Sequence, residues 1–269
     1  MPQYTLEKLV EKLKSDVLGK WHKEGRVGND GSAGNTLEDL LGISENNLKL
    51  PDWGDIELKT SRKDSQSLIT LLHREPKPNA SVPRLLLSLG WRHKRAGEKY
   101  PEDELSFRST TRANSFSDRG FAIELHEDKI TFVFDPVQVK SSSPDRTGAY
   151  ATYGDWLKDV EQRELHYSDV LPVFWDKSYI VNEIKHKLDN TLLLIVRSKS
   201  IDGEKHFYFE SAILFSGFKP SKLDKLFSDK ALYVDFDART RHNHGTKFRI
   251  DLGAINELFE RSVPIFKST

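Results

Sequence analysis

Apolar residues near the start of the chain recur at the spacing of a helix. Leu6, Leu9, Val10, Leu13 and Val17 fall on one helical face, so residues 5–20 are predicted to form an amphipathic helix that covers the core. Similar patterns predict helices at residues 153–163, 180–188, 221–228 and 254–261. Residues 82–91 form a short apolar segment that fits a buried strand as well as a helix.

Apolar and polar residues alternate elsewhere, which predicts strands. Ile56 and Leu58 are apolar whereas Glu57 and Lys59 are polar, a pattern typical of a half-buried strand. Further strands are predicted at residues 66–72, 121–125, 130–134, 191–196, 207–209 and 232–236, with antiparallel sheet between 105 and 134. Strands and helices in this mixture indicate an α/β fold with a central mixed sheet flanked by helices.

A glycine-rich segment, residues 25–35, precedes a predicted short helix. Its spacing matches neither a phosphate-binding loop nor a dinucleotide fingerprint, so it is read as a flexible loop near DNA or a plain linker. The helix is expected to start at Asn35 and to end at Gly42. Glu38 is then either the carboxylate of a capping box or a third acid that points at the charged strand.

The polar face of the strand that follows Pro51 carries chemistry. With a period of two, Asp55, Glu57 and Lys59 share one face, and Asp52 lies in the turn that leads into it. Nearby carboxylates repel unless a cation neutralises them, and Mg²⁺ prefers oxygen ligands. A metal there can activate water, with Lys59 placed to orient it, which points to phosphodiester hydrolysis. The alternative is a solvated strand of paired charges.

Composition limits the alternatives. The chain has 269 residues, 41 basic and 41 acidic, so net charge gives no sign of a phosphate-rich partner. It has no cysteine, which excludes disulfides, thiolate zinc sites and cysteine nucleophiles. The first residues lack a signal-peptide pattern, and no apolar run is long enough to span a membrane. A cytoplasmic location is therefore expected.

Basic and histidine residues gather late in the chain, in residues 239–249. Arginine can grip guanine edges and lysine or histidine can neutralise phosphates, so this segment, read as a loop, suits DNA recognition. A solvated turn is the alternative. His73, where the predicted second strand ends, is either a polar cap or a functional group, and the basic run 92–95 is either solvated or a phosphate contact.

The string Pro51-Asp52 followed by Glu57-Leu58-Lys59 resembles the PD-(D/E)XK nuclease signature. Segments spread over most of the chain resemble the MvaI/BcnI family of restriction endonucleases: Gly34-Asn-Thr-Leu-Glu-Asp-Leu-Leu-Gly-Ile43, Pro51-Asp52, Ile56-Glu-Leu-Lys59, Leu71-Leu-His-Arg-Glu-Pro76, Arg108-Ser-Thr, Ser117-Asp-Arg-Gly-Phe-Ala-Ile-Glu124 and His244-Gly-Thr-Lys-Phe-Arg249. The order of the acids is more distantly similar to the mismatch-repair nickase MutH.

The resemblance implies a restriction-endonuclease-like fold with a second lobe that forms a DNA-binding cleft. Residues 1–140 are then the catalytic lobe and residues 153–269 the recognition lobe, separated by a polar loop at 141–152. It also implies a Mg²⁺-dependent type II restriction endonuclease that cuts double-stranded DNA at a CC-N-GG-like target as a monomer, one strand after the other. A cognate DNA methyltransferase in the same prokaryotic system is expected, with no stable protein partner.

The implied site follows residue by residue. Asp52, Glu57 and the Leu58 carbonyl bind the metal, Asp55 is a reserve ligand, Lys59 orients water and Glu38 assists. The expected DNA contacts are His73 with the arginine beside it in His73-Arg74-Glu75, Arg108, Arg239, Arg241, His242, His244, Lys247 and Arg249. Two other functions remain open, a MutH-like strand-nicking repair endonuclease and a non-catalytic DNA-binding module.

Overall fold

The computed structural model of the protein describes residues 4–26, 31–43, 51–63 and 68–268. Its contacts divide the chain into two compact units, unit 1 with residues 1–69, 183–222 and 251–269, and unit 2 with residues 70–182 and 223–250. The chain passes between the units more than once, and the loop at 141–152 lies inside unit 2. The compact units therefore do not follow the expected boundary, and the assignment of catalysis to 1–140 and recognition to 153–269 stays a functional prediction.

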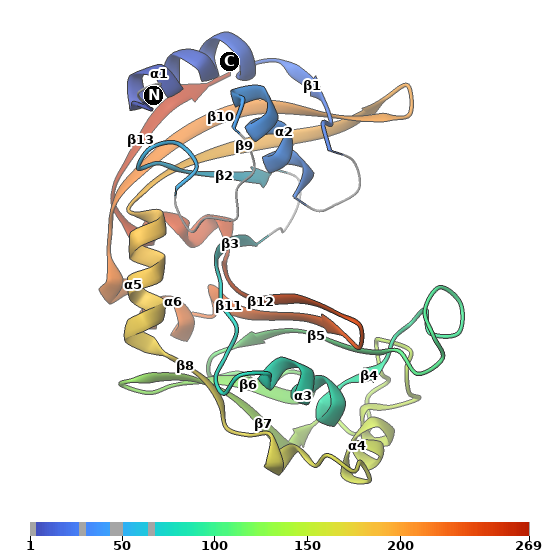
Figure 1. Ribbon diagram of the computed structural model, residues 1–269. Helices are drawn as coiled ribbons and strands as arrows, with labels where there is room; N and C mark the ends of the chain where they lie inside the picture. The colour runs from blue at the N-terminus through green and yellow to red at the C-terminus, as the bar shows by residue number, and fades with distance from the viewer. Residues whose placement is uncertain (1–3, 27–30, 44–50, 64–67, 269) are drawn as a thin grey trace. The chain divides into compact units, whose positions relative to one another are not determined.

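Unit 1 is built on one mixed sheet. Its strands, in spatial order, are β1 (Trp21–Lys23), β10 (Glu204–Phe218), β9 (Asn190–Ile201) and β2 (Glu57–Arg62), and β13 (Phe259–Lys267) also pairs with β10. Strand β2 runs parallel to β9, whereas the other pairings are antiparallel, and β9, β10 and β13 lie side by side in Figure 1. The predicted mixed sheet is confirmed, and the strand that carries Glu57 is anchored against β9.

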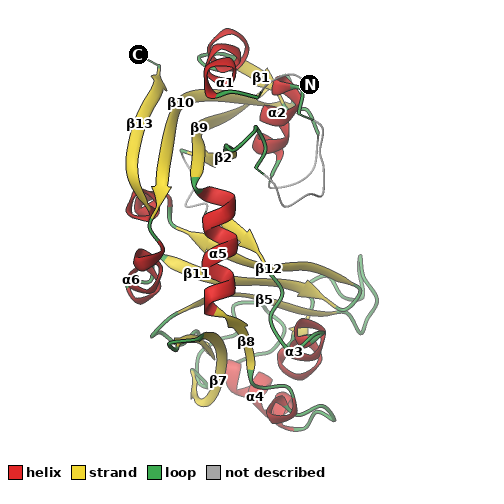
Figure 2. Ribbon diagram, turned by 60° about the vertical axis from the view of Figure 1, so that its left-hand side comes forward, coloured by secondary structure: helices red, strands yellow, loops and turns green. Residues whose placement is uncertain are grey.

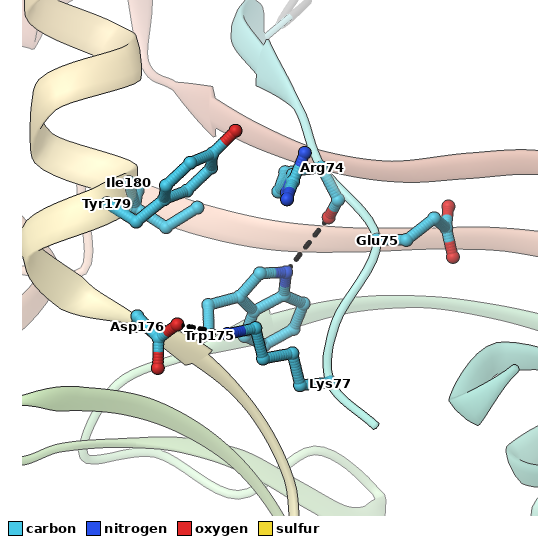
Figure 3. Close-up of a pocket in the computed structure, with 7 residues that line it drawn as sticks. All are labelled: Arg74, Glu75, Lys77, Trp175, Asp176, Tyr179 and Ile180. Carbon is cyan, nitrogen blue, oxygen red and sulfur yellow. Dashed lines mark hydrogen bonds and ion pairs between the residues drawn. The ribbon is translucent and has the colours of Figure 1, made fainter. Parts of the chain in front are cut away.

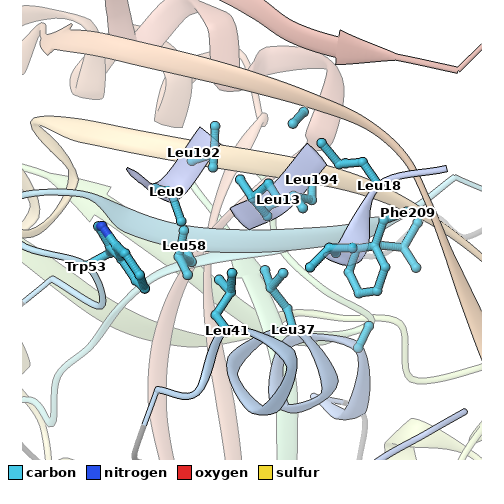
Figure 4. Packing of buried hydrophobic residues seen from close by; sticks show 14 of the residues in the cluster. Leu9, Leu13, Leu18, Leu37, Leu41, Trp53, Leu58, Leu192, Leu194 and Phe209 are labelled. Carbon is cyan, nitrogen blue, oxygen red and sulfur yellow. The ribbon is translucent and has the colours of Figure 1, made fainter. Parts of the chain in front are cut away.

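Two helical segments cover the sheet of unit 1. The first is α1 (Leu6–Lys12), which continues into a π-helical turn η1 (Leu13–Val17), and the second is α2 (Ser32–Leu41). Their leucines form one buried cluster with Leu58, Leu192 and Phe209 of the strands; in Figure 4, Leu37 and Leu41 of α2 point toward Leu58 of β2. This apolar packing fixes the strand on which the acids lie.

Unit 2 contains two more sheets. One has the order β3 (Ile69–His73), β12 (His242–Ile250), β11 (Leu232–Arg239), β5 (Leu105–Arg112) and β4 (Trp91–Arg92), and the other has β6 (Arg119–Leu125), β7 (Lys129–Val139) and β8 (Val173–Asp176). Phe107 and Phe236 of the first sheet meet Phe121 and Phe132 of the second, with ring centroids 5.1–6.1 Å apart. This phenylalanine cluster joins the two sheets into one core.

Helices flank these sheets: α3 (Ser81–Leu89), α4 (Tyr153–Glu161), α6 (Leu223–Ser228) and the one-turn η2 (Tyr167–Asp169). A further helix, α5 (Lys177–Leu188), leads directly into β9 (Figure 2). Short 3-10 turns are found at η3 (Pro220–Lys222) and η4 (Leu252–Leu258). The predicted helices near 153–163, 180–188 and 221–228 are confirmed, and the ambiguous residues 82–91 are mainly helical.

Three sequence predictions were wrong. The helix expected from Asn35 begins at Ser32, so Asn35 lies inside α2 and Glu38 is not its capping-box residue. The closing helix expected at 254–261 is a 3-10 turn followed by β13, because this stretch pairs with β10 and Phe259 stacks on Phe215. The basic segment 239–249 is mostly strand β12 and not a loop.

No helix in the described part of the chain is both long and apolar enough to cross a membrane.

Candidate active site

A tight turn brings Asp52 back against strand β2. Trp53 and Ile56 exchange backbone hydrogen bonds of 3.0 and 2.9 Å, and Gly54 between them has a φ of +65°, a conformation that glycine adopts without strain. The buried Trp53 ring also donates to the Thr5 carbonyl at 3.1 Å. The carboxylate of Asp52 then accepts a hydrogen bond of 2.8 Å from the Leu58 amide, which holds it beside the strand.

Glu57 is the most enclosed group of the site. Only 2% of its side chain is exposed, and its Oε1 forms an ion pair with Lys59 on the same strand. The predicted common face of Glu57 and Lys59 is therefore confirmed. Its other oxygen, Oε2, is buried and has no hydrogen-bond partner among the described residues. An unpaired buried carboxylate oxygen costs free energy, so this atom is suited to bind a ligand.

Electrostatic coupling joins Asp52 to Glu57. Burial is the main cause that raises the pKa of Asp52 above its ordinary value, and the neighbouring charge of Glu57 raises it further. The amide of Leu58 and the ammonium groups of Lys59 and Lys187 oppose this rise. Two acids that resist simultaneous ionisation are the arrangement that a divalent cation relieves.

The donor set fits an open magnesium site. Within the residues that the structure describes, no group of three or more His, Cys, Asp or Glu side chains is arranged to hold a metal. Mg²⁺, however, commonly takes only one or two protein carboxylates and completes its shell with water and phosphate oxygens. Asp52 and Glu57 provide two such carboxylates, and the unpaired Oε2 of Glu57 leaves a position for the ion.

The other predicted acids have partners of their own. Asp55 is exposed and accepts a hydrogen bond of 2.9 Å from Asn190 at the start of β9. Glu38, on α2, pairs with Arg26 at 3.0 Å. Helix α2 packs against β2, since Gly34 lies near the Thr60 hydroxyl. The assisting role of Glu38 and the reserve role of Asp55 stay predictions.

Sequence reasoning missed one cation at this site. Lys187, in the last turn of α5, lies 3.3 Å from Oε1 of Glu57. A basic residue at the end of a helix is ordinarily explained by the helix dipole, so the sequence contains no signal that separates Lys187 from its neighbours. Only the parallel pairing of β2 with β9, which follows α5 directly, brings it to Glu57.

In unit 2, a fully buried carboxylate anchors the basic turn between β11 and β12. Glu104 pairs with Arg239 at 2.8 Å and with Arg241 at 3.0 Å. Burial alone raises the pKa of Glu104. The hydrogen bonds and charges of the two arginines outweigh burial, so the pKa of Glu104 is lowered. The guanidinium of Arg239 also stacks on Tyr100 at 4.6 Å. Arg241 remains half exposed, whereas Arg239 is mostly covered, so Arg241 is the more accessible of the two predicted DNA contacts.

Acids pair with the other predicted basic contacts. Asp237 lies 2.8 Å from Arg108 and 3.6 Å from Lys247, and Asp235 lies 2.9 Å from Arg249. These partners are carried by β11, between the two strands that carry the cations. The pairing fixes the direction of the basic side chains across the sheet.

The structure brings the predicted histidines together. His242 and His244 are exposed on β12, with ring centroids 4.1 Å apart. His73, at the end of β3, reaches the same strand, because a Cβ placed on Gly245 would lie 3.7 Å from its Nδ1. Burial is the main cause that lowers the pKa of His244, which favours a neutral ring that both donates and accepts hydrogen bonds.

A small hollow of about 120 Å³ lies beside Arg74, next in sequence to His73. The guanidinium of Arg74 faces the ring of Tyr179 at 4.4 Å (Figure 3), and its carbonyl accepts from the Trp175 indole at 2.9 Å. Tyr179 and Trp175 come from α5 and β8, more than a hundred residues away in sequence. No local pattern could have identified them as partners of this arginine.

Comparisons with known proteins bear on the family and the fold. The model of the MvaI/BcnI restriction endonuclease family matches residues 10–259. A solved structure, "Restriction endonuclease MvaI-cognate DNA substrate complex", is 23% identical, with a TM-score of 0.75 over 99% of this chain and 100% of that one. "Restriction endonuclease MvaI in the absence of DNA" is also 23% identical, with a TM-score of 0.49 over 99% of each chain. No curated protein matches the chain. The restriction-endonuclease-like fold is thereby confirmed.

Proposed function

Because the chain belongs to the MvaI/BcnI restriction endonuclease family, we propose that its site-specific cleavage of double-stranded DNA depends on Mg²⁺ and takes place at Asp52, Glu57 and Lys59. One observation carries the proposal. The two acids are coupled to each other beside Lys59, and a buried oxygen of Glu57 has no partner within the described residues. A pair of carboxylates with a vacant ligand atom suits a divalent cation.

Asp52 and Glu57 would hold the ion through their carboxylates, and the Leu58 carbonyl is the third expected donor. The hydrogen bond from the Leu58 amide to Asp52 supports this set, because it ties one ligand to the residue that provides another. Asp55 is the reserve ligand. Its bond to Asn190 makes it less available than Asp52.

Each residue of the proposed site has a role in phosphodiester hydrolysis. When bound, Mg²⁺ would polarise the phosphate and lower the pKa of a water molecule. Lys59, held at Glu57, orients the attacking water with its ammonium group. Glu38, on the helix packed against β2, is the assisting acid. Asp52 keeps its carboxylate directed toward the strand through the Leu58 amide.

Recognition of DNA is assigned to the basic side chains of unit 2. Arg108, Arg241, Lys247 and Arg249 project from adjacent strands or their turn, and His73, His242 and His244 gather near one end of β12. Their acidic partners fix them without removing them all from solvent, since Arg108 and Arg241 stay about half exposed. Ordered arginine and histidine groups can bind base edges and phosphates.

We also propose the finer properties that the resemblance to the family implies. The target is of the CC-N-GG kind, and a monomer cuts the two strands in turn. The enzyme works in the prokaryotic cytoplasm beside a cognate DNA methyltransferase that protects the host's own sites. A solved MvaI structure is described as a complex with cognate DNA substrate, which supports double-stranded DNA as the ligand.

Digestion of a supercoiled plasmid of known sequence tests the proposal. With Mg²⁺, the enzyme should convert supercoiled DNA to linear product through a transient nicked circle, and sequencing of the ends should locate one short target. Nicked circles that persist without linear product would favour the MutH-like alternative. Specific binding without any cut would leave only a DNA-binding module, and cleavage that proceeds in excess EDTA would contradict the metal dependence.

A further inference from the structure

Two ammonium groups converge on a single oxygen of Glu57. Lys59 reaches Oε1 from the same strand, and Lys187 reaches it from helix α5 at 3.3 Å. The other oxygen, Oε2, is bonded to nothing among the described residues. One oxygen of the Glu57 carboxylate is thus paired with two ammonium groups, whereas the other has no hydrogen-bond partner among the described residues.

The cluster has as many basic groups as acidic ones. It consists of the carboxyl groups of Asp52 and Glu57 and the amino groups of Lys59 and Lys187. Lys187 is the member of this cluster that comes from another element, the last turn of helix α5. About a third of its side chain is exposed. A partly exposed lysine can swing away from Glu57 without leaving a buried charge unpaired.

We propose that Lys187 is the counter-ion of Glu57 in the metal-free enzyme, which a divalent cation must displace, so that Lys187 sets the magnesium concentration that the enzyme requires. This inference rests on the proposed metal site at Asp52 and Glu57. An ion that binds Oε2 lies a few Å from the ammonium on Oε1, and like charges at such a separation repel strongly in a partly buried site. Binding of Mg²⁺ and retention of Lys187 on Glu57 therefore oppose each other.

The alternative explanation is that Lys187 only stabilises its helix. Lys185, His186 and Lys187 all lie in the last turn of α5, where positive charge interacts favourably with the helix dipole. Lys185 is exposed in the same turn. If the lysines only stabilise the helix, substitution of Lys185 and substitution of Lys187 should have equal effects on Mg²⁺ binding. If Lys187 is the counter-ion of Glu57, only its substitution should change Mg²⁺ binding.

The experiment measures thermal unfolding of the full chain against MgCl₂ concentration, with KCl adjusted to keep the ionic strength constant. The probe is Mg²⁺ alone, without DNA, because a ligand that binds only the folded state raises Tm once its concentration exceeds its Kd. The proteins are wild type, Lys187→Met, Lys187→Arg and Lys185→Met, with Lys187→Gln as a second neutral variant. Asp52→Asn identifies the part of the Tm rise that belongs to the site.

Removal of the charge should tighten Mg²⁺ binding. In Lys187→Met and Lys187→Gln, Tm should begin to rise at an about tenfold lower Mg²⁺ concentration than in wild type, as expected when one nearby unit charge is removed. Lys187→Arg and Lys185→Met should match wild type. Equal or weaker Mg²⁺ binding in the neutral variants, or the same change in Lys185→Met, would overturn the inference. A wild-type Tm that does not respond to Mg²⁺, or responds equally in Asp52→Asn, would instead overturn the proposed metal site.

Discussion

The carboxylate of Asp52 accepts a hydrogen bond of 2.8 Å from the backbone amide of Leu58. This bond joins a residue before a tight turn to the start of strand β2, and it places Asp52 beside Glu57. Burial and the charge of Glu57 raise the pKa of Asp52. Asp52 and Glu57 therefore repel each other in the metal-free protein, and this repulsion lowers its stability. The proposed cation would relieve it.

Asp52→Asn is predicted to raise the stability of the metal-free protein and to lower its cleavage activity. The amide oxygen can still accept from Leu58, while the repulsion from Glu57 is removed, so Tm of the metal-free protein should rise by about 2 °C. Plasmid cleavage should fall at least about 100-fold, because the neutral amide is a poor magnesium ligand. Asp55→Asn tests the reserve ligand, and its loss of cleavage should be at least about tenfold smaller since Asp55 is exposed. Equal losses would make Asp55 a principal ligand.

Cleavage should also depend on pH through Asp52. A protonated carboxyl does not bind metal, and the pKa of Asp52 is raised in the folded protein. As the pH is lowered, Mg²⁺ binding should therefore weaken at a higher pH than it would at an aspartate with an ordinary pKa. For stability the sign is opposite, because the favourable contribution of a raised carboxyl pKa is present at low pH and is lost as pH rises through it. Mg²⁺ titrations at several pH values check the first statement, and metal-free unfolding checks the second.

Glu104→Gln should weaken both stability and DNA binding. Glu104 is fully buried and balances Arg239 and Arg241, and loss of one partner of a buried charge cluster typically costs about 3–5 kcal/mol. Urea unfolding and fluorescence anisotropy with target DNA measure the two effects. Glu102→Gln is the matched control, because its ion pair with Arg92 is exposed and should be worth less than about 1 kcal/mol. Equal effects of the two variants would remove Glu104 as the anchor of the turn.

Tyr179→Ala should lower DNA affinity through Arg74. The tyrosine ring supports the guanidinium at 4.4 Å, and an exposed cation–π contact contributes about 0.5–1 kcal/mol, or roughly a twofold to fivefold change in affinity. Tyr179→Phe keeps the ring and should bind DNA as wild type does. Cleavage at saturating DNA should be unchanged in both. If the alanine variant binds with wild-type affinity, Arg74 does not depend on Tyr179 for a DNA contact.

Glu210→Gln should reveal a pH-dependent contribution to stability. Arg197 and Lys63 bond its carboxylate and lower the pKa of Glu210 to about 2. A lowered pKa stabilises the folded state above the ordinary glutamate value, and the contribution disappears as the pH falls toward about 2. The variant should therefore unfold at a lower Tm than wild type at pH 7, and the difference should shrink at pH 3. A constant difference across this range would assign the loss to packing.

The strand that carries Glu57 and Lys59 was predicted well because its signals are local. Alternation at Ile56 and Leu58 determines which residues share a face, and a period of two then puts Glu57 with Lys59, as the ion pair confirms. The order of most strands and helices follows from similar local patterns. The start of α2 was misplaced because Asn35 and Glu38 imitate a capping box inside a helix that begins at Ser32.

The partners of the site could not be predicted, because they depend on long-range pairing. Lys187 meets Glu57 only through the parallel register of β2 and β9. Glu104 meets Arg239 across more than a hundred residues, through the pairing of β5 with β11. The helix predicted at 254–261 is instead a 3-10 turn that leads into β13, because pairing with β10 decides the conformation from Phe259 onward. Tertiary context of this kind overrides weak local preferences.

Calorimetric titration of Mg²⁺ into wild type, Asp52→Asn and Glu57→Gln is the most direct measurement of whether these two acids hold the ion. Each substitution should weaken Mg²⁺ binding at least about tenfold, because it removes one of only two charged ligands. Binding that is unchanged in both variants would show that the ion lies elsewhere and would contradict the proposed site.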